Sequence, residues 1–494
     1  HFSIAGYSLD GIRGNAQMSN GLAHASINSD NKMLNGNIGI DAMTNGNKLS
    51  ATLACQFSEL DLYKLGVVES PLNVSMCTHL DMSTNLNDTH AIQGSIGDIV
   101  LQDNDGIYRP EDIDMDVILR PDTTHAIVSC GDFYLNMDAS GSYEDLLSAI
   151  GNVSDEVIRQ MDERYIDQPM LRKRLPLASI KLNSGSENVV ARMLKRYSIG
   201  CGSLAMDMTS SPTSGLNGYM RANAMTVSDI LVDTASLVIF SDSSNVSYRM
   251  QVHNNKDNPD YIFNAIVEGT LTEKGTTIKS RLYDWKDRLG LATDMSAAME
   301  DNGVKVTFIG DGPVLGYKKF AVNKDNYLFL SEDKRVSANL KLRASDGTGL
   351  QVYTNDENAD ALQDITLSVN KLDLDDIFAI LPFTPNMTGI LDGDFHAIQT
   401  PDELTVSSSL TVSNMIYEGC KMGDVGTEFT YMPLSNGSHS VDGIMIHNGQ
   451  EIGTLSGTYA SEGDGFLDAT LSLAHTPLSL VNGFIPDQLF GLNG

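Results

Sequence analysis

The sequence is short of basic residues and of long apolar runs, and each shortage excludes a class of protein. Of its 494 residues, 33 are Lys or Arg and 64 are Asp or Glu, which gives a formal net charge of −31. Because a nucleic-acid binder needs clustered basic residues to neutralise phosphates, no nucleic-acid partner is expected. No run of about 18 apolar residues occurs, so the sequence predicts no helix that crosses a bilayer.

Cysteine and histidine are too sparse or too scattered for a metal site. The five cysteines are odd in number, lie far apart and form no C-x-x-C pair, so they are expected to be small buried hydrophobes. The ten histidines include no pair at metal-ligand spacing. The sequence therefore predicts neither a disulfide framework nor a metal, and no cofactor is expected.

Catalytic motifs are equally scarce, and no enzymatic activity is expected. There is no P-loop and no dinucleotide fingerprint, and the segment 453–457 places Ser456 one position too late for a nucleophile elbow. The run from Asp103 to Gly106 resembles part of a calcium loop, but the alignment puts Leu101 at the first ligand position. That run is therefore interpreted as a hairpin turn.

Strict alternation of apolar and polar residues is the strongest positive signal. Alternation of this kind predicts strands with one apolar and one solvated face, which belong to antiparallel sheet. Turn sequences such as Asn45-Gly46-Asn47 and Asp346-Gly347 separate the segments, as in a long meander of hairpins. The alternating segments include 49–57, 113–120, 133–139, 304–308, 336–342, 404–412 and 467–473.

Between residues 143 and 199 the apolar spacing changes to that of helices. Ser154 is expected to cap a helix whose apolar stripe runs to Tyr165, and Ser186 to cap a second helix that stops at Gly200. The sequence thus predicts an all-β protein with a small helical insert, divided into a β segment 1–142, the insert 143–199 and a β segment 200–494.

A weak internal repeat combines a strand, a brief helix and a glycine-rich return to a strand. In its clearest copy, Thr366-Leu367 precedes a short helix that Asp373 is expected to cap and Pro382 to end. The sequence from Leu367 to Phe395, the step Met422-Gly423-Asp424-Val425, the strand 453–459 and the segment 471–493 follow in an order that resembles the periplasmic part of the TamB family, within the AsmA-like group. The resemblance is clearest over residues 365–494.

This resemblance implies an elongated, open antiparallel β-groove with an apolar interior. It implies a periplasmic location in a diderm bacterium, in a protein whose inner-membrane anchor lies outside this chain. It also implies phospholipid as the groove ligand and an outer-membrane barrel of the Omp85 type as a partner, in lipid transport between the membranes, in assembly of outer-membrane proteins, or in both. The start at His1 without a signal peptide is expected of a piece of a longer protein.

A groove for acyl chains needs a continuous apolar surface, because each CH₂ left in water costs about 0.8 kcal/mol. One-faced strands provide such a surface, and the 22 methionines offer an adaptable lining. The predicted lipid face comprises Met115, Val117, Leu119, Leu135, Met137, Met206, Met208, Val306, Phe308, Leu340, Leu342, Leu367, Val369, Val406, Leu410, Val412, Leu471 and Leu473.

Alternation alone leaves other β proteins open. A structural or adhesive array of sandwiches with dry cores buries one face of each strand in the same way. It predicts linkers roughly every 100 residues, typical of small domains, and no such regular boundaries are visible. A carbohydrate-active protein is less favoured, because aromatic residues make up only 7% of the chain and Trp285 is its single tryptophan.

Overall fold

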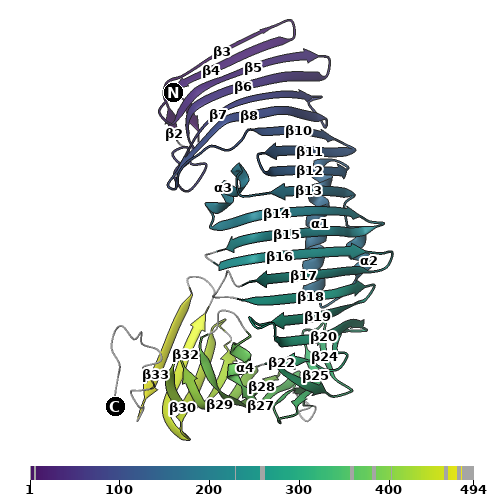
Figure 1. Cartoon of the computed structure of the whole chain (residues 1–494), viewed down its shortest axis with the longest axis vertical. Helices are drawn as coiled ribbons and strands as arrows, with labels where there is room; N and C mark the ends of the chain where they lie inside the picture. The colour runs from purple at the N-terminus through teal and green to yellow at the C-terminus, as the bar shows by residue number, and fades with distance from the viewer. Residues whose placement is uncertain are drawn as a thin grey trace. The chain divides into compact units, whose positions relative to one another are not determined.

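The computed structural model describes residues 2–4, 7–227, 230–255, 262–355, 361–380, 385–401, 403–434, 436–460, 465–474 and 480. Strands hold 66% of the residues and helices 9%, which confirms the predicted all-β class. Thirty-one strands form one antiparallel sheet (Figure 1). The curling of this sheet into a groove stays a prediction. By internal contacts the chain divides into two units, one of His1–Val157 with Pro169–Met250 and one of Ile158–Gln168 with Gln251–Gly494.

The first unit is a meander in which each strand pairs with the next along the chain, apart from β1 and β2, which pair only with each other. The short strand β9 pairs with the end of β8, which also pairs with β10. The strands are β1 (Phe2–Ile4), β2 (Tyr7–Leu9), β3 (Ile12–Ser19), β4 (Leu22–Asp30), β5 (Leu34–Asn45), β6 (Lys48–Asp61), β7 (Leu72–Thr84), β8 (His90–Asp103), β9 (Gly106–Tyr108), β10 (Ile113–Arg120), β11 (Thr123–Cys130), β12 (Phe133–Ser140), β13 (Ala178–Ser184), β14 (Ile199–Ser211), β15 (Gly215–Val227) and β16 (Ile230–Ser241).

The second unit continues the same antiparallel pattern, with one local rearrangement in which β20 pairs with both β21 and β22 and β25 pairs with both β23 and β24. The strands, from β17 at the boundary between the units, are β17 (Val246–Asn254), β18 (Phe263–Thr272), β19 (Gly275–Tyr283), β20 (Leu289–Glu300), β21 (Gly303–Phe308), β22 (Val314–Leu315), β23 (Lys318–Val322), β24 (Tyr327–Ser331), β25 (Val336–Ala344), β26 (Gly349–Thr354), β27 (Gln363–Asp373), β28 (Met387–Gln399), β29 (Leu404–Tyr417), β30 (Cys420–Pro433), β31 (His439–His447), β32 (Gln450–Ala460) and β33 (Phe466–Leu473).

The polar face of the first unit is held together by side chains that lie directly opposite each other on neighbouring strands. His24 and Asp41 are register partners, and Nδ1 of the first lies 2.7 Å from Oδ1 of the second. His125 and Asp138 repeat this arrangement at 2.6 Å. Such cross-strand pairs are the unit of sheet stabilisation, so the alternating polar residues specify register as well as solubility.

Helix α1 (Tyr143–Asp162) is one continuous helix, so the prediction that a helix begins at Ser154 is wrong. The cap is Ser142, whose Oγ accepts the Asp145 backbone N–H at 3.1 Å while the Asp145 carboxylate accepts the Ser142 N–H at 3.1 Å. This reciprocal pair satisfies donors that the first turn leaves free. Ser154 lies in the middle of the helix because the apolar spacing continues through it.

The rest of the 143–199 segment contains α2 (Gln168–Lys173), α3 (Val189–Lys195) and, between them, strand β13. The sequence prediction missed β13, which lies between two stretches of helical spacing. The cap of α3 is Asn188 and not Ser186, since the Asn188 side chain accepts the Ala191 N–H. Asn188 is fully buried and also donates to Asp132 at 2.7 Å, so the cap fixes α3 to the β11–β12 turn.

Two further local predictions are confirmed. Asp373 caps the short helix α4 (Leu374–Phe378) by accepting the Asp375 N–H; the end predicted at Pro382 lies outside the described residues. The run that begins at Asp103 is a hairpin turn, with the Asp105 N–H donated to the Asp103 carboxylate at 2.9 Å.

Closed cores are small in this fold. Among the described residues, three clusters of buried apolar side chains occur, centred on Leu72 and Leu101, on Phe320 and Leu342, and on Met422 and Ile452. The chain exposes 28325 Å² of surface, whereas a compact protein of this mass exposes about 18,000 Å². Much of both faces of the sheet is therefore accessible to solvent.

Candidate functional site

The first unit carries an uninterrupted apolar row across its sheet, formed by residues that lie opposite each other on thirteen neighbouring strands. Because strands are about 4.8 Å apart, the row is roughly 60 Å long. It contains no polar side chain and consists of Ala16, Ala25, Ile40, Leu53, Leu80, Gly94, Met115, Val128, Leu135, Leu182, Met206, Met220 and Leu237; we call it row A.

A second apolar row runs beside it, two residues further along each strand and therefore on the same face. It too lacks polar side chains and consists of Met18, Ala23, Ala42, Ala51, Met82, Ile92, Val117, Ala126, Met137, Ile180, Met208, Gly218 and Ile239; we call it row B. The face that carries rows A and B is called the apolar face below.

The structure brings the predicted lipid-face residues of this unit together. Met115, Leu135 and Met206 lie in row A, and Val117, Met137 and Met208 in row B, while Leu119 belongs to the next row on the same face. The sequence prediction missed β11 and β13, which lie between these strands and contribute Val128, Ile180 and Leu182, and β15 and β16, which follow them and contribute Met220, Leu237 and Ile239. The consecutive apolar residues Ala126, Ile127 and Val128 break the alternation in β11, and β13 was hidden in the helical insert.

Accessibility differs along this face. Met220 is 41% exposed, whereas the row that follows row B at the strand ends is covered. There Thr124 and Ala139, which are register partners, are 1% and 6% exposed, and the Ser210 hydroxyl oxygen is buried. Small side chains thus mark the covered margin, and larger half-exposed ones mark the middle of the face.

In the second unit the predicted residues also share one face. Leu340, Leu367 and Leu471 lie in one register row, through Val352 and through the strands from β28 to β32. Leu342, Val369, Leu410 and Leu473 lie in the row beside it. The other predicted residues lie on β21 (Val306 and Phe308) and on β29 (Val406 and Val412).

Not all of these side chains are equally available to a ligand. Leu342 is 5% exposed and packs with Phe320, which is fully buried, in a closed cluster. Leu367 and Leu471 are 37% and 51% exposed. A ligand on this face would contact Leu367 or Leu471 and not Leu342.

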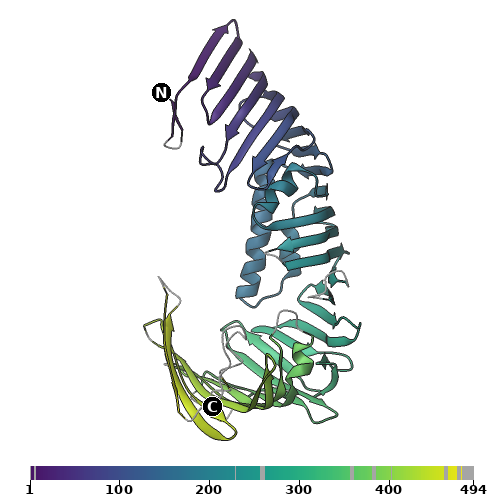
Figure 2. The same cartoon turned by 60° about the vertical axis from the view of Figure 1, so that its left-hand side comes forward.

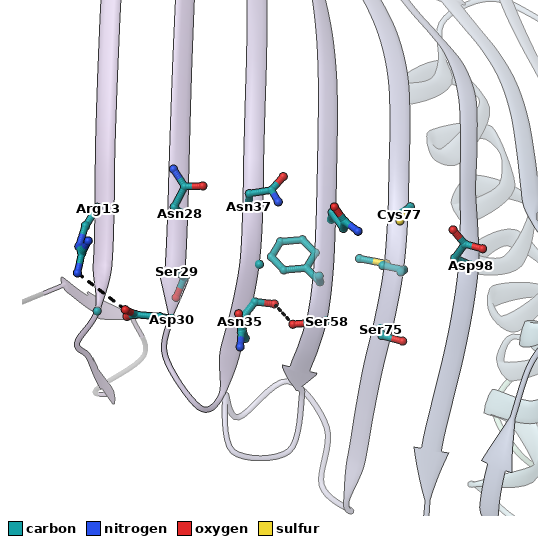
Figure 3. A pocket seen from close by; sticks show the side chains of 15 residues that line it. Arg13, Asn28, Ser29, Asp30, Asn35, Asn37, Ser58, Ser75, Cys77 and Asp98 are labelled. Atoms are coloured by element: carbon teal, nitrogen blue, oxygen red, sulfur yellow. Dashed lines mark hydrogen bonds and ion pairs between the residues drawn. The ribbon is translucent and has the colours of Figure 1, made fainter.

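Two hollows lie mainly on the opposite, polar face. One of about 600 Å³ contains Arg13, Asn28, Asn37 and Cys77, which come from neighbouring strands and lie in one register row (Figure 3). A second, of about 990 Å³, is lined mostly by polar-face residues such as Asp41, together with Ala23, Ala42, Ala51 and Met82 of row B. None of the residues predicted from the sequence for the lipid face lines either hollow.

Metal ligands and thiols were the remaining candidates for a reactive or ion-binding site. Within the described residues, no group of three His, Cys, Asp or Glu side chains is placed to hold a metal ion. All five cysteines are free thiols, and burial raises the pKa of Cys55. In the part of the chain that the structure describes, no helix is long and apolar enough to cross a membrane.

Comparisons with models of known protein families, with curated proteins and with solved structures give no significant match. The resemblance to the TamB family therefore stays a prediction based on the order of its short motifs. The structure adds one observation that bears on function, which is the pair of continuous apolar rows A and B on one face of the sheet.

Proposed function

We propose that this chain is a lipid-binding segment of an envelope protein, which holds phospholipid acyl chains on its apolar face and passes them along the sheet without catalysis. The observation that carries the proposal is the pair of apolar rows A and B, unbroken over thirteen strands. Accessibility supports it, because most side chains of the two rows are partly exposed and an apolar surface of this length is unfavourable in water without a ligand.

Methionine suits this use. Met115, Met137, Met206, Met208 and Met220 lie within six neighbouring strands on the same face. Their unbranched, polarisable side chains adapt to chains of different length and unsaturation. This argues for acyl chains of several kinds and against one rigid ligand.

Periplasmic location, transport between the two membranes and an Omp85-type barrel partner belong to this proposal through the motif resemblance alone. The dry-core sandwich is the competing proposal. It requires that a second layer cover rows A and B, whereas Met220 in row A is 41% exposed.

The test is photo-crosslinking with matched positions on the two faces. Benzoylphenylalanine at Val117 or Met206 should capture phospholipid after incubation with phospholipid vesicles, and the same group at the neighbouring Asp116 or Asp207 should not. Organic extraction and mass spectrometry of the purified chain should also release phospholipid. Equal labelling of the two faces would exclude the proposed lipid surface.

A further inference from the structure

Helix α1 turns an apolar flank to solvent while it buries charged and polar groups. Tyr143, Leu147, Ile150 and Val157 are 42%, 64%, 54% and 40% exposed. Their spacing of four, three and seven residues places them on one side of a helix. In contrast, Glu156 is 1% exposed. This is the reverse of an ordinary surface helix, in which the apolar stripe packs on the core.

The position of α1 on the sheet follows from contacts at the strand ends. The Thr124 hydroxyl donates to the Gly141 carbonyl at 3.1 Å, just before α1 begins, and Thr124 and Ala139 belong to the covered small-residue row beside row B. Figure 2 shows α1 lying against one face of the sheet. The helix therefore lies on the apolar face, over its margin, where small side chains allow close approach.

The flank of α1 that faces the strand ends is identified by Arg174. Two residues earlier, Arg172 donates to the carbonyls of Thr213 and Asp242, which are turn residues beyond the ends of β14 and β16. Arg174 itself binds the Glu156 carboxylate at 2.9 Å and the Asn152 carbonyl at 3.3 Å. The side of α1 that carries residues 152 and 156 thus faces the strand ends.

The apolar flank lies on the other side of the helix. With 3.6 residues per turn, Leu147 and Ile150 are displaced from the Asn152 and Glu156 side by about 150° around the axis. From Leu146, which is 7% exposed and thus on the covered side of the helix, Leu147 is displaced by about 100° and Ile150 by about 40°. The flank consequently points along the sheet surface, toward row B and row A.

We propose that α1 is a side wall of the lipid surface, and that Tyr143, Leu147, Ile150 and Val157 hold a phospholipid acyl chain against rows B and A. This inference rests on the proposed function and assigns a role to the helical segment. Charge disfavours docking on an anionic membrane, because α1 has a single basic residue, Arg159, against five acidic ones, Glu144, Asp145, Asp155, Glu156 and Asp162. The occupant is therefore one phospholipid molecule held by the protein, not a membrane surface.

The experiment places benzoylphenylalanine at Leu147 or Ile150 on the apolar flank. Ser148, exposed on the polar side of the same helix, is the matched control, and Met206 in row A reports on the proposed function independently. The full chain is incubated with dioleoylphosphatidylcholine vesicles, separated from them by sedimentation and irradiated. Lipid adducts are then counted by intact-protein mass spectrometry.

We expect adducts at Leu147, Ile150 and Met206, and few at Ser148. Adducts at Met206 with only control-level labelling at Leu147 and Ile150 would overturn the assignment of α1 as a side wall. The proposed function would still stand. Absence of adducts at all positions would overturn both. If only vesicle-bound protein is labelled, the apolar flank contacts a membrane surface. If Leu147 forms protein–protein crosslinks, the flank contacts a protein partner. Either result would overturn the assignment of α1 as a side wall of the lipid surface.

Substitution gives a second readout. Ile150→Glu should reduce the phospholipid retained after sedimentation by about tenfold, which corresponds to about 1.4 kcal/mol. Ser148→Glu should leave it unchanged. Both variants should keep the circular dichroism spectrum of the parent, because both side chains are exposed. Equal retention by Ile150→Glu and the parent would contradict the wall.

Discussion

Arg174 and Glu156 form an ion pair in which the guanidinium Nη2 lies 2.9 Å from the carboxylate Oε2, with Glu156 1% and Arg174 37% exposed. The pair joins the middle of α1 to the segment that enters β13. Because Glu156 is buried and Arg174 is half-buried, the two partners differ in what their removal leaves behind. Removal of Arg174 takes this ion pair away from a buried carboxylate.

The first prediction concerns this pair. Arg174→Ala should lower the free energy of unfolding by about 1–3 kcal/mol, less than the 3–5 kcal/mol of a fully buried pair because Arg174 is partly solvated. Urea denaturation measures the change, and amide exchange in residues 143–157 should rise with it. Arg174→Lys keeps the charge and should lose less; an unchanged unfolding curve for Arg174→Ala would contradict the role of the pair.

The second prediction is a pH dependence at α3. Arg192 donates to both Asp103 oxygens, Nε at 3.1 Å and Nη2 at 2.6 Å, and Asp103 is 5% exposed. Burial acts to raise the pKa of Asp103, but the Arg192 hydrogen bond, with the Asp105 N–H and the charges of Arg192 and Arg196, holds it below its ordinary value.

Because the folded-state pKa is depressed, this stabilisation is fully present above the unfolded pKa of about 3.9 and is lost as pH falls through the folded value. We therefore expect the protection of the α3 amides against exchange, corrected for intrinsic rates, to be the same at pH 7 and pH 5. Below pH 4 this protection should fall. Asp103→Asn should remove the acid-induced step. Retention of that step in Asp103→Asn would assign it to other carboxylates.

The third prediction tests backbone geometry at Gly218 in row B. Its φ is +138°, and a Cβ there would lie 2.0 Å from the Asp207 carbonyl oxygen. Gly218→Ala should therefore cost about 1–3 kcal/mol in stability. Gly39 in β5 is the matched control, because a Cβ there meets its nearest neighbour, the Ala54 oxygen, at 3.8 Å. Comparable thermal midpoints for the two variants would contradict this account.

Period-two alternation predicted the strands because it depends only on which side chains of a single strand face an apolar surface. It placed Met115 on the apolar side of its own strand, but membership of a row depends on the register across all the strands of the sheet. Local capping was less informative. Ser154 and Ser142 are both good cap residues, and the reciprocal hydrogen bonds with Asp145 select Ser142.

What alternation could not predict is which part of the apolar face is covered. Thr124 and Ala139 are buried because helix α1 begins beside them, and Leu342 is buried because Phe320 from a separate short strand packs on it. Both contacts are tertiary. Small residues at the strand ends are a usable signal for a helix on a sheet, whereas Leu342 and Leu367 look alike in sequence.

The last prediction uses that difference. Leu342 and Met220 both lie on apolar faces, at 5% and 41% exposure. Leu342→Asp buries a carboxylate in a closed cluster, which costs several kcal/mol or raises its pKa, comparable with the 5–15 kcal/mol that stabilises a typical domain. That variant should aggregate or melt far below the parent.

Met220→Asp places the same carboxylate in row A, where water reaches it, so the chain should stay soluble and β-rich by circular dichroism. The charge should nevertheless interrupt the hydrocarbon path, so phospholipid retained after sedimentation should fall while Met220→Leu retains the parent amount. If Met220→Asp unfolds as Leu342→Asp does, row A is closed in solution and the dry-core sandwich replaces the lipid surface. If Met220→Asp folds and retains lipid in full, row A is not the path, because a carboxylate in the middle of a surface that binds acyl chains must weaken that binding.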